Sequence, residues 1–155
     1  MPLYCIVDCA AAPGLRGEVL RAGRCCALLA GKLDPDLAEA SPHLAEVEQN
    51  APLLNLLASP EGRAGGFGCV LHADMTLGTL WRILRKKLIA RMPDGEVVMF
   101  RFFDPRVLPP YLESLSPEEC APWFDGITDW WLPRPEGTLH YTMPGGALIR
   151  TPLSV

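Results

Sequence analysis

The stretch FGCVLHADMTLGTLWRILRKKLIAR, residues 67–91, holds the two patterns on which the fold prediction rests. Phe67–His72 is short and apolar, which is typical of a buried β-strand. Thr76–Arg91 is predicted to be a helix, because apolar residues recur along it at the spacing of one narrow helical stripe. That stripe consists of Leu77, Leu80, Trp81, Leu84 and Leu88. A strand followed by an amphipathic helix favours a sheet covered by helices.

The same alternation continues on both sides of this stretch. Apolar runs rich in strand formers predict further strands at Leu3–Val7, Arg24–Ala30, His43–Val47 and Glu96–Phe102. Cap and proline signals predict helices at Gly14–Ala22, Pro52–Leu57, Val107–Leu115 and Pro117–Phe124. Three glycines and a proline predict a loop at Glu61–Gly66. The tail predicts a meander of short antiparallel strands at Ile127–Leu132, Leu139–Met143 and Ala147–Arg150. We therefore expect one α/β domain over residues 1–155, with a mixed β-sheet flanked by helices and a C-terminal antiparallel β-meander.

Length and composition limit the classes of protein to which the chain can belong. A chain of 155 residues favours one domain, and 49% hydrophobic with 21% charged residues indicates a globular protein. The net charge of −4 argues against general binding to nucleic acid or to an anionic membrane. No apolar run approaches the roughly 20 residues of a membrane span. The start, MPLYCIVD, lacks the basic segment of a signal peptide, so we expect a cytoplasmic protein.

The spacing of the reactive side chains predicts no catalytic, metal or cofactor site. The six cysteines contain no Cys-x-x-Cys pair, and no histidine falls at zinc-ligand spacing to two of them, so we expect reduced thiols in the core. There is no Gly-x-Ser-x-Gly motif, and no glycine loop that follows a strand and opens a helix. Cys69 and His72 are three positions apart on one expected strand, so they point to opposite faces. Any other pairing of a cysteine with a histidine depends on the tertiary structure.

The polar face of the expected helix Thr76–Arg91 is strongly basic. It carries Arg82, Arg85, Lys86, Lys87 and Arg91. Such a face can contact nucleic acid, a membrane or a protein partner. The acidic stretches 34–48 and 113–129 also allow it to be balanced within the molecule, and it can simply be solvated.

Residues 98–108, VMFRFFDPRVL, form the most unusual segment of the chain. In a strand, Arg101 would lie between aromatic residues, where it needs a carboxylate or carbonyl partner. Asp104 and Arg106 flank Pro105 where the chain turns into the next helix, which Asp104 can cap. Two interpretations follow: an ion-pair network that holds strand to helix, or a polar contact surface. We expect these four residues to be structural.

Residues 100–108, FRFFDPRVL, resemble the Phe-Arg-Phe-Tyr-Asp-Pro-Arg-Val signature of the bacterial type VI secretion effector adaptor (chaperone) family. Residues 40–44 resemble the family's Ser/Ala-Pro-Tyr-Leu segment, and residues 66–68 its Trp-Gly strand entry. Residues 92–95 are similar to its Leu-Pro-Asp-Gly turn and residues 118–126 to its Pro-Glu-Glu…Phe-Phe-Gly stretch. The similarity covers about residues 3–132. The chain departs from the family pattern at His43, Phe103, Pro109 and Pro110.

This resemblance implies a function in protein binding and no enzymatic activity. Adaptors of this family bind an effector toxin in the cytoplasm of a Gram-negative bacterium and help to load it onto the spike protein, VgrG. The implied partners are therefore a secreted effector encoded next door and the spike protein, with no cofactor, no nucleic acid and no membrane insertion. The alternative class is a small intracellular hydrolase that uses a cysteine or an aspartate with a histidine.

Two adjacent tryptophans are the first candidates for partner binding. Trp130 and Trp131 lie on one short expected strand, so they point to opposite faces and cannot both enter the same core layer. We expect one of them to be partly exposed, and tryptophan is frequent among the residues that dominate interfaces. The next candidates are the basic residues Arg82, Arg85 and Lys86.

Overall fold

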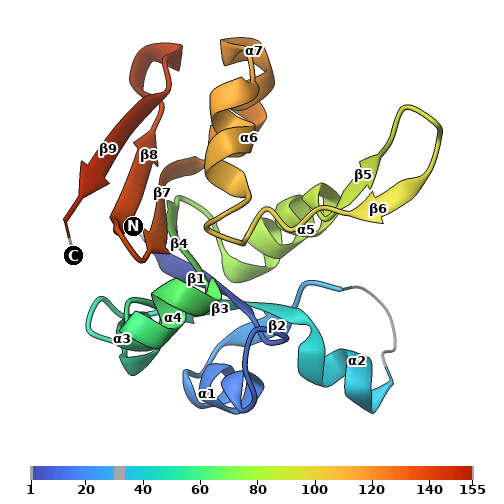
Figure 1. The fold of residues 1–155 in the computed structure, drawn as a ribbon, viewed down its shortest axis with the longest axis vertical. Helices are drawn as coiled ribbons and strands as arrows, with labels where there is room; N and C mark the ends of the chain where they lie inside the picture. Colours follow the sequence, from blue (N-terminus) through green and yellow to red (C-terminus); the bar gives the residue numbers. More distant parts are fainter. Residues whose placement is uncertain (1, 30–33, 155) are drawn as a thin grey trace.

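The computed structural model of the protein describes residues 2–29 and 34–154. Its centre is a seven-stranded sheet with the order β2-β3-β1-β4-β7-β8-β9 (Figure 1). Across the sheet these strands are Cys25–Ala27, Pro42–Val47, Leu3–Asp8, Gly68–Ala73, Ile127–Arg134, Gly137–Thr142 and Ile149–Leu153. The expected α/β fold is confirmed, and β7, β8 and β9 form the expected C-terminal meander.

Every strand pair of the described sheet is antiparallel rather than mixed. The reason lies in the position of β1. The strands β3 and β4 follow one another in the chain and run in the same direction, but β1 lies between them and pairs with both in the opposite direction. No parallel strands therefore become neighbours.

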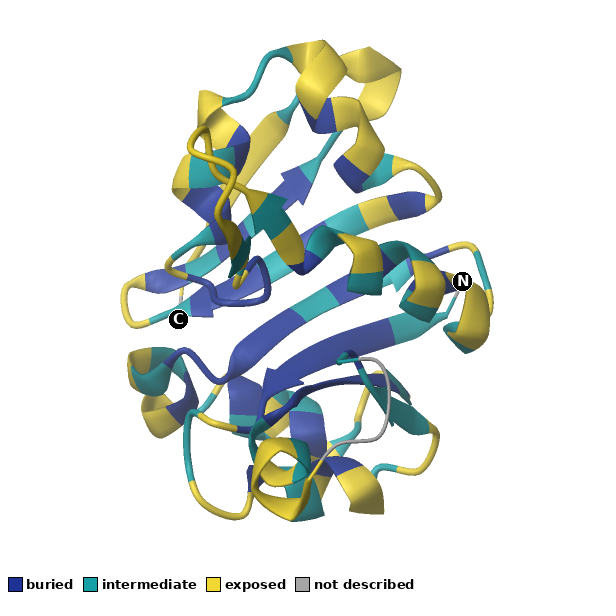
Figure 2. Ribbon diagram, turned by 90° about the vertical axis from the view of Figure 1, so that its right-hand side faces the viewer, coloured by how far each residue is buried: buried dark blue, intermediate teal, exposed yellow. Residues whose placement is uncertain are grey.

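The two faces of the sheet carry separate hydrophobic cores. Along β1, Tyr4 and Ile6 face the first core, whereas Cys5 and Val7 face the second. Successive side chains of a strand point to opposite faces, so a strand buried on both sides is apolar throughout. Figure 2 shows the buried strands crossing the middle of the molecule, with largely exposed helices on both sides.

The helices are distributed over both faces of the sheet. The first core is covered by α5 (Leu77–Lys87), α6 (Leu108–Ser114), α7 (Pro117–Cys120) and η1 (Ala121–Phe124). The second core is covered by α1 (Leu15–Arg21) and α3 (Pro52–Leu57). A short 3-10 turn, η2 (Pro144–Gly146), connects β8 to β9. None of the helices in the described ranges is long and apolar enough to cross a membrane.

The helix expected at Thr76–Arg91 is correct at its start and wrong at its end. Thr76 accepts a hydrogen bond from the Thr79 amide and so caps α5, but the helix stops at Lys87. Ile89–Arg91 instead forms β5, which pairs with β6 (Val97–Met99) in a hairpin separate from the main sheet. The turn at residues 92–95 folds the chain back on itself, and the cross-strand pairing outweighs the helical periodicity.

Four other expected elements differ from the structure. The strand expected at Ala147–Arg150 runs instead from Ile149 to Leu153. The strand expected at Glu96–Phe102 ends at Met99, after which the chain runs in tight turns. The strand expected at Arg24–Ala30 is only the three-residue β2, and Ala30 lies outside the described residues. The loop expected at Glu61–Gly66 is wrong, because Pro60–Gly65 forms the helix α4.

Two short helices that the sequence did not predict begin in the same way. In α4, Ser59 accepts a hydrogen bond from the Gly62 amide, and in α2 (Pro35–Ala40), Asp34 accepts one from the Leu37 amide. Each helix starts with a proline, which is compatible with the first turn because the missing N–H has no partner there. A proline that looks like a breaker in the sequence therefore starts a helix.

Candidate functional site

Residues 100–108 lie against the end of the first strand, β1. Arg101 follows the hairpin, and its Nη2 donates a hydrogen bond to Oδ2 of Asp8, the last residue of β1, over 2.6 Å. The same Nη2 lies 3.5 Å from Oδ2 of Asp104. Both carboxylates are buried, whereas the Arg101 side chain is 45% exposed. One guanidinium thus bridges two buried acids at the edge of the first core.

A second arginine holds Asp104 in a two-point contact. Arg106 Nε donates to Oδ1 of Asp104 over 2.9 Å, and its Nη2 donates to Oδ2 over 2.8 Å. The backbone amide of Arg106 donates to the same Oδ1. This paired geometry gives stronger and more directional hydrogen bonds than a single contact. The Asp104 side chain therefore fixes the turn around Pro105 and does not cap α6 as expected, since the N-cap of α6 is Val107.

The formal charges of this cluster sum to zero. It consists of Asp8, Arg101, Asp104 and Arg106. The pKa values of its two acids are shifted in opposite directions. Burial raises the pKa of the Asp8 carboxyl, and this effect outweighs the opposing influence of Arg101 and of the Ala10 amide. Burial also acts to raise the pKa of Asp104, but the hydrogen bonds and charge of Arg106 and the charge of Arg101 hold it below its usual value. Asp104 is therefore the firmly ionised member of the cluster.

The residue that ends α4, Gly66, lies against the Arg106 side chain of this cluster. Gly66 has φ +62°, and a Cβ built on it would lie only 3.0 Å from Nη2 of Arg106. This position needs glycine for its backbone conformation and for the close approach of the guanidinium. The cluster thus connects β1, the end of α4 and the turn before α6, in the arrangement of the ion-pair interpretation. Its half-exposed arginines also reach the surface, so the contact-surface interpretation stays open.

The two tryptophans lie on opposite faces of β7, as their spacing predicts. Trp130 is fully buried in the first core, and its Nε1 donates to the Trp123 carbonyl over 2.9 Å. Trp131 is partly exposed, stacks on His140 with ring centroids 4.8 Å apart, and meets His72 edge-on at 4.9 Å. Of these two tryptophans, only Trp131 is accessible to a partner in this structure.

The basic residues of α5 divide into two groups. Arg82 and Lys86 are exposed, and within the described residues neither forms an ion pair. Arg85 lies over the Trp81 ring at 4.6 Å, and Nζ of Lys87 lies 4.5 Å from the Trp123 ring centroid. The helix thus uses two cations for cation–π contacts and leaves two in solvent.

A cysteine and a histidine that are far apart in the sequence do meet in the fold. Sγ of Cys9 lies 3.5 Å from Nδ1 of His43, but that nitrogen is also 2.9 Å from the Ser41 carbonyl oxygen. A carbonyl only accepts hydrogen bonds, so Nδ1 carries a proton and cannot take one from the thiol. Burial raises the pKa of Cys9 to about 12 and lowers that of His43. His43 therefore cannot act as the base that would activate Cys9 as a nucleophile.

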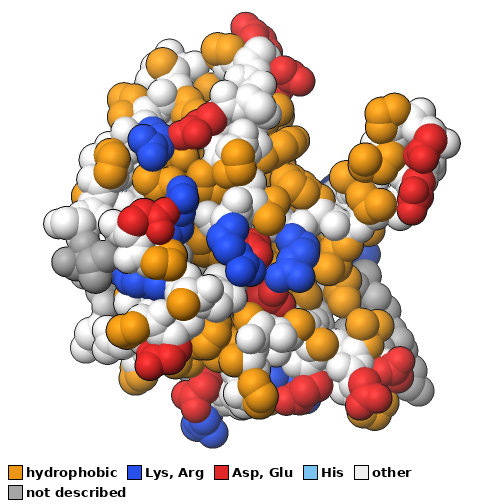
Figure 3. Space-filling view, viewed as in Figure 1, with side chains coloured by type: hydrophobic (Ala, Val, Ile, Leu, Met, Phe, Trp, Pro, Cys, Tyr) orange, Lys and Arg blue, Asp and Glu red, His pale blue; other side chains and the backbone are white. Residues whose placement is uncertain are grey.

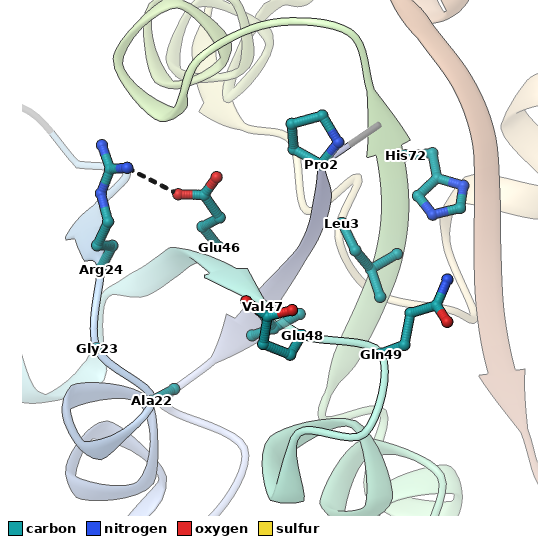
Figure 4. Close-up of a pocket in the computed structure, with 10 residues that line it drawn as sticks. All are labelled: Pro2, Leu3, Ala22, Gly23, Arg24, Glu46, Val47, Glu48, Gln49 and His72. Atoms are coloured by element: carbon teal, nitrogen blue, oxygen red, sulfur yellow. Dashed lines mark ion pairs between the residues drawn. The ribbon is translucent and has the colours of Figure 1, made fainter.

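A cavity of about 690 Å³ opens where the starts of β1 and β2 meet the end of β3 (Figure 4). An ion pair between Arg24 and Glu46, 3.1 Å long, lies on one side of it, and His72 and Gln49 lie on the other. The His72 ring is turned toward Asp129, with Nδ1 3.6 Å from its Oδ2. Polar and apolar groups line the cavity in similar measure, and no group of three metal-ligating side chains is arranged for a metal in the described residues.

Comparison with known proteins places the chain in a family. No curated protein and no solved structure matches the chain. The model of one family, described as a domain of unknown function (DUF4123), matches residues 3–121. This range contains β1, the hairpin and all four residues of the ion-pair cluster, Asp8, Arg101, Asp104 and Arg106. The chain therefore belongs to the DUF4123 family, which is associated with effector adaptors of type VI secretion.

Proposed function

We propose that this protein is a cytoplasmic adaptor that binds a secreted effector toxin and helps to load it onto the spike protein of a type VI secretion system. The observation that carries this proposal is the family match over residues 3–121. The resemblance of residues 100–108 to the adaptor signature supports it, and three residues of that segment, Arg101, Asp104 and Arg106, join the turn before α6 to Asp8 of β1. The proposed activity is protein binding without catalysis.

An adaptor that connects two proteins needs two accessible surfaces that can be occupied together. Trp131 emerges from one face of the sheet, beside His72 and His140. Arg82 and Lys86 lie on α5, which packs on the other face. The two candidate surfaces differ in chemistry, one aromatic and one basic, so each can be specific for a different partner.

The direct experiment is copurification of the tagged, full-length chain with two separate baits. These are the product of the neighbouring open reading frame and the spike protein. We expect the chain to retain the neighbouring product in a stable complex that also captures the spike. Failure of the folded chain to bind either bait would overturn the proposal.

A further inference from the structure

The hairpin formed by β5 and β6 projects from the body of the molecule (Figure 1) and exposes large hydrophobic side chains. Four of the eight large hydrophobic residues exposed in the described chain lie on it. They are Ile89, Met92, Val97 and Met99, which are 58%, 45%, 51% and 46% exposed. In the space-filling view, hydrophobic side chains follow the projecting hairpin (Figure 3).

The strand register gathers three of these side chains, Ile89, Val97 and Met99, on one face. Ile89 pairs with Met99, and Arg91 pairs with Val97. Directly opposite residues of an antiparallel pair share a face, and alternate residues along a strand do as well. The two pairs therefore form one continuous exposed surface, whereas Ala90 and Val98 on the other face are partly buried.

The hairpin gains no support from the seven-stranded sheet, because its two strands pair only with each other. A two-stranded hairpin is at best marginally stable in water, and an apolar exposed face makes it more costly. An apolar cluster along a projecting hairpin is typical of a surface that a partner covers.

Positive charges lie at the base of the hairpin, and negative charges lie at its far end. The helix α5 leads directly into β5, and its exposed Arg82 and Lys86 stand one helical turn apart, without ion pairs in the described chain. Arg91 adds a third cation on the apolar face itself, where its Nη1 lies 3.4 Å from the Gly95 carbonyl oxygen. The acids of the hairpin are at its far end, where Asp94 accepts a hydrogen bond from the Glu96 amide. The base of the hairpin is therefore electropositive.

We propose that this surface is the docking site for a segment of the effector that presents apolar side chains next to carboxylates. We define the hairpin surface as Ile89, Arg91, Val97 and Met99, with Arg82 and Lys86 at its base. This inference rests on the proposed function and adds the position of the site and the chemistry of the segment bound there. A second copy of the chain fits less well, because it would bring a second set of the same cations to the interface instead of carboxylates that complement them.

The test uses two variants of the full-length chain and one matched control. Ile89→Thr with Met99→Thr removes apolar area but keeps residues that favour strands. Arg82→Glu with Lys86→Glu reverses the charge at the base without touching the hairpin. Ile149→Thr with Leu153→Thr is the control, because these residues are equally exposed on β9, at 46% and 41%.

The measured quantity is the affinity for the purified product of the neighbouring open reading frame, together with a thermal melt of each variant. We expect the hairpin variant to bind about thirty-fold more weakly, and the β9 control to bind like the wild type. The charge reversal weakens binding about ten-fold at low salt and less at high salt. If the hairpin variant unfolds, the affinity of the charge-reversal variant alone decides whether the docking site is correct.

Four results would overturn the inference, and they are distinguishable. If the wild type binds and both variants bind equally well, the docking site is wrong and the adaptor function stands. If the β9 control loses the same affinity, the hairpin is not the site. If the wild-type chain sediments as a dimer that the hairpin variant lacks, the surface belongs to a second copy. Absence of binding by the wild type would refute the proposed function itself, and the inference with it.

Discussion

The Arg101 guanidinium and the Asp8 carboxylate are 93 positions apart in the chain and 2.6 Å apart in the fold. Through this contact, residues 100–108 are attached to the end of the central strand β1. Arg101 also approaches Asp104, which Arg106 holds from the other side. These ion pairs thus join the main sheet to the region that leads from the hairpin to α6.

Removing this joint lowers stability. We expect Arg101→Ala to reduce the free energy of unfolding by about 2–3 kcal/mol, because the buried Asp8 loses its cation. The partial exposure of Arg101 keeps the loss below that of a fully buried pair. Urea unfolding measures it, with Arg82→Ala as the control, expected within about 0.5 kcal/mol of the wild type. An unchanged midpoint with loss of effector binding would instead support the contact-surface interpretation.

The low pKa of Asp104 predicts a specific loss of stability in acid. Its folded-state pKa lies below the ordinary value of 3.8, so its contribution is complete well above that pH and is lost as the pH falls through the folded-state pKa. Asp8, whose pKa is raised, acts in the opposite direction. The comparison of Asp104→Asn with the wild type isolates the Asp104 contribution. We expect the difference in unfolding free energy between them to be larger at pH 7 than at pH 2.5; an equal difference at both would contradict the ion-pair assignment.

A pair of glycine substitutions separates backbone strain from helix propensity. Gly66→Ala places a methyl group against Arg106 at a positive φ, and we expect a loss of about 1–2 kcal/mol. Gly78→Ala is the matched control, because Gly78 is exposed in α5 with nothing within 4 Å of its added Cβ, and it gains up to about 1 kcal/mol. Thermal melts of the two variants should shift in opposite directions. A stabilised Gly66→Ala variant would contradict the packing of Arg106 on this position.

The buried thiol of Cys9 is expected to be unreactive. Its pKa of about 12 keeps it protonated at pH 8, and only the thiolate attacks an alkylating reagent. Mass spectrometry of the iodoacetamide-treated native chain should find Cys9 modified far more slowly than in the urea-unfolded chain. Cys9→Ala should leave effector delivery intact. Rapid alkylation of the native chain, or loss of delivery with normal folding, would favour the hydrolase alternative.

The two tryptophans should respond differently to truncation. Trp130→Ala empties a core position and costs about 3–5 kcal/mol. Trp131→Ala should retain most of the stability and, if its face binds a partner, reduce affinity for the effector or the spike protein by about 2 kcal/mol or more. Melting curves and binding to both partners are measured side by side. Normal binding of both partners by the Trp131 variant would exclude this face.

Local patterns in the sequence predicted the elements whose stability depends on near neighbours. The apolar stripe of α5 places Leu80 and Leu84 in the core, and period-two alternation places Trp130 and Trp131 on opposite faces. The resemblance of residues 100–108 to the family signature also agrees with the family to which the chain belongs. These predictions succeed because a helical stripe or a strand face is set by residues a few positions apart.

Only the tertiary structure decided which of these residues meet across the fold. Nothing in the sequence identifies Asp8 as the partner of Arg101, because that contact exists only once β1 and the turn before α6 are brought together. The same holds for the end of α5, where pairing of Ile89–Arg91 with Val97–Met99 replaces the helical turn that the periodicity predicts. It also holds for the choice of Trp130 over Trp131 for the core, because the elements after the signature cover one face of β7 and leave the other partly open. Local periodicity fixes which side of an element is apolar, whereas chain topology fixes what that side contacts.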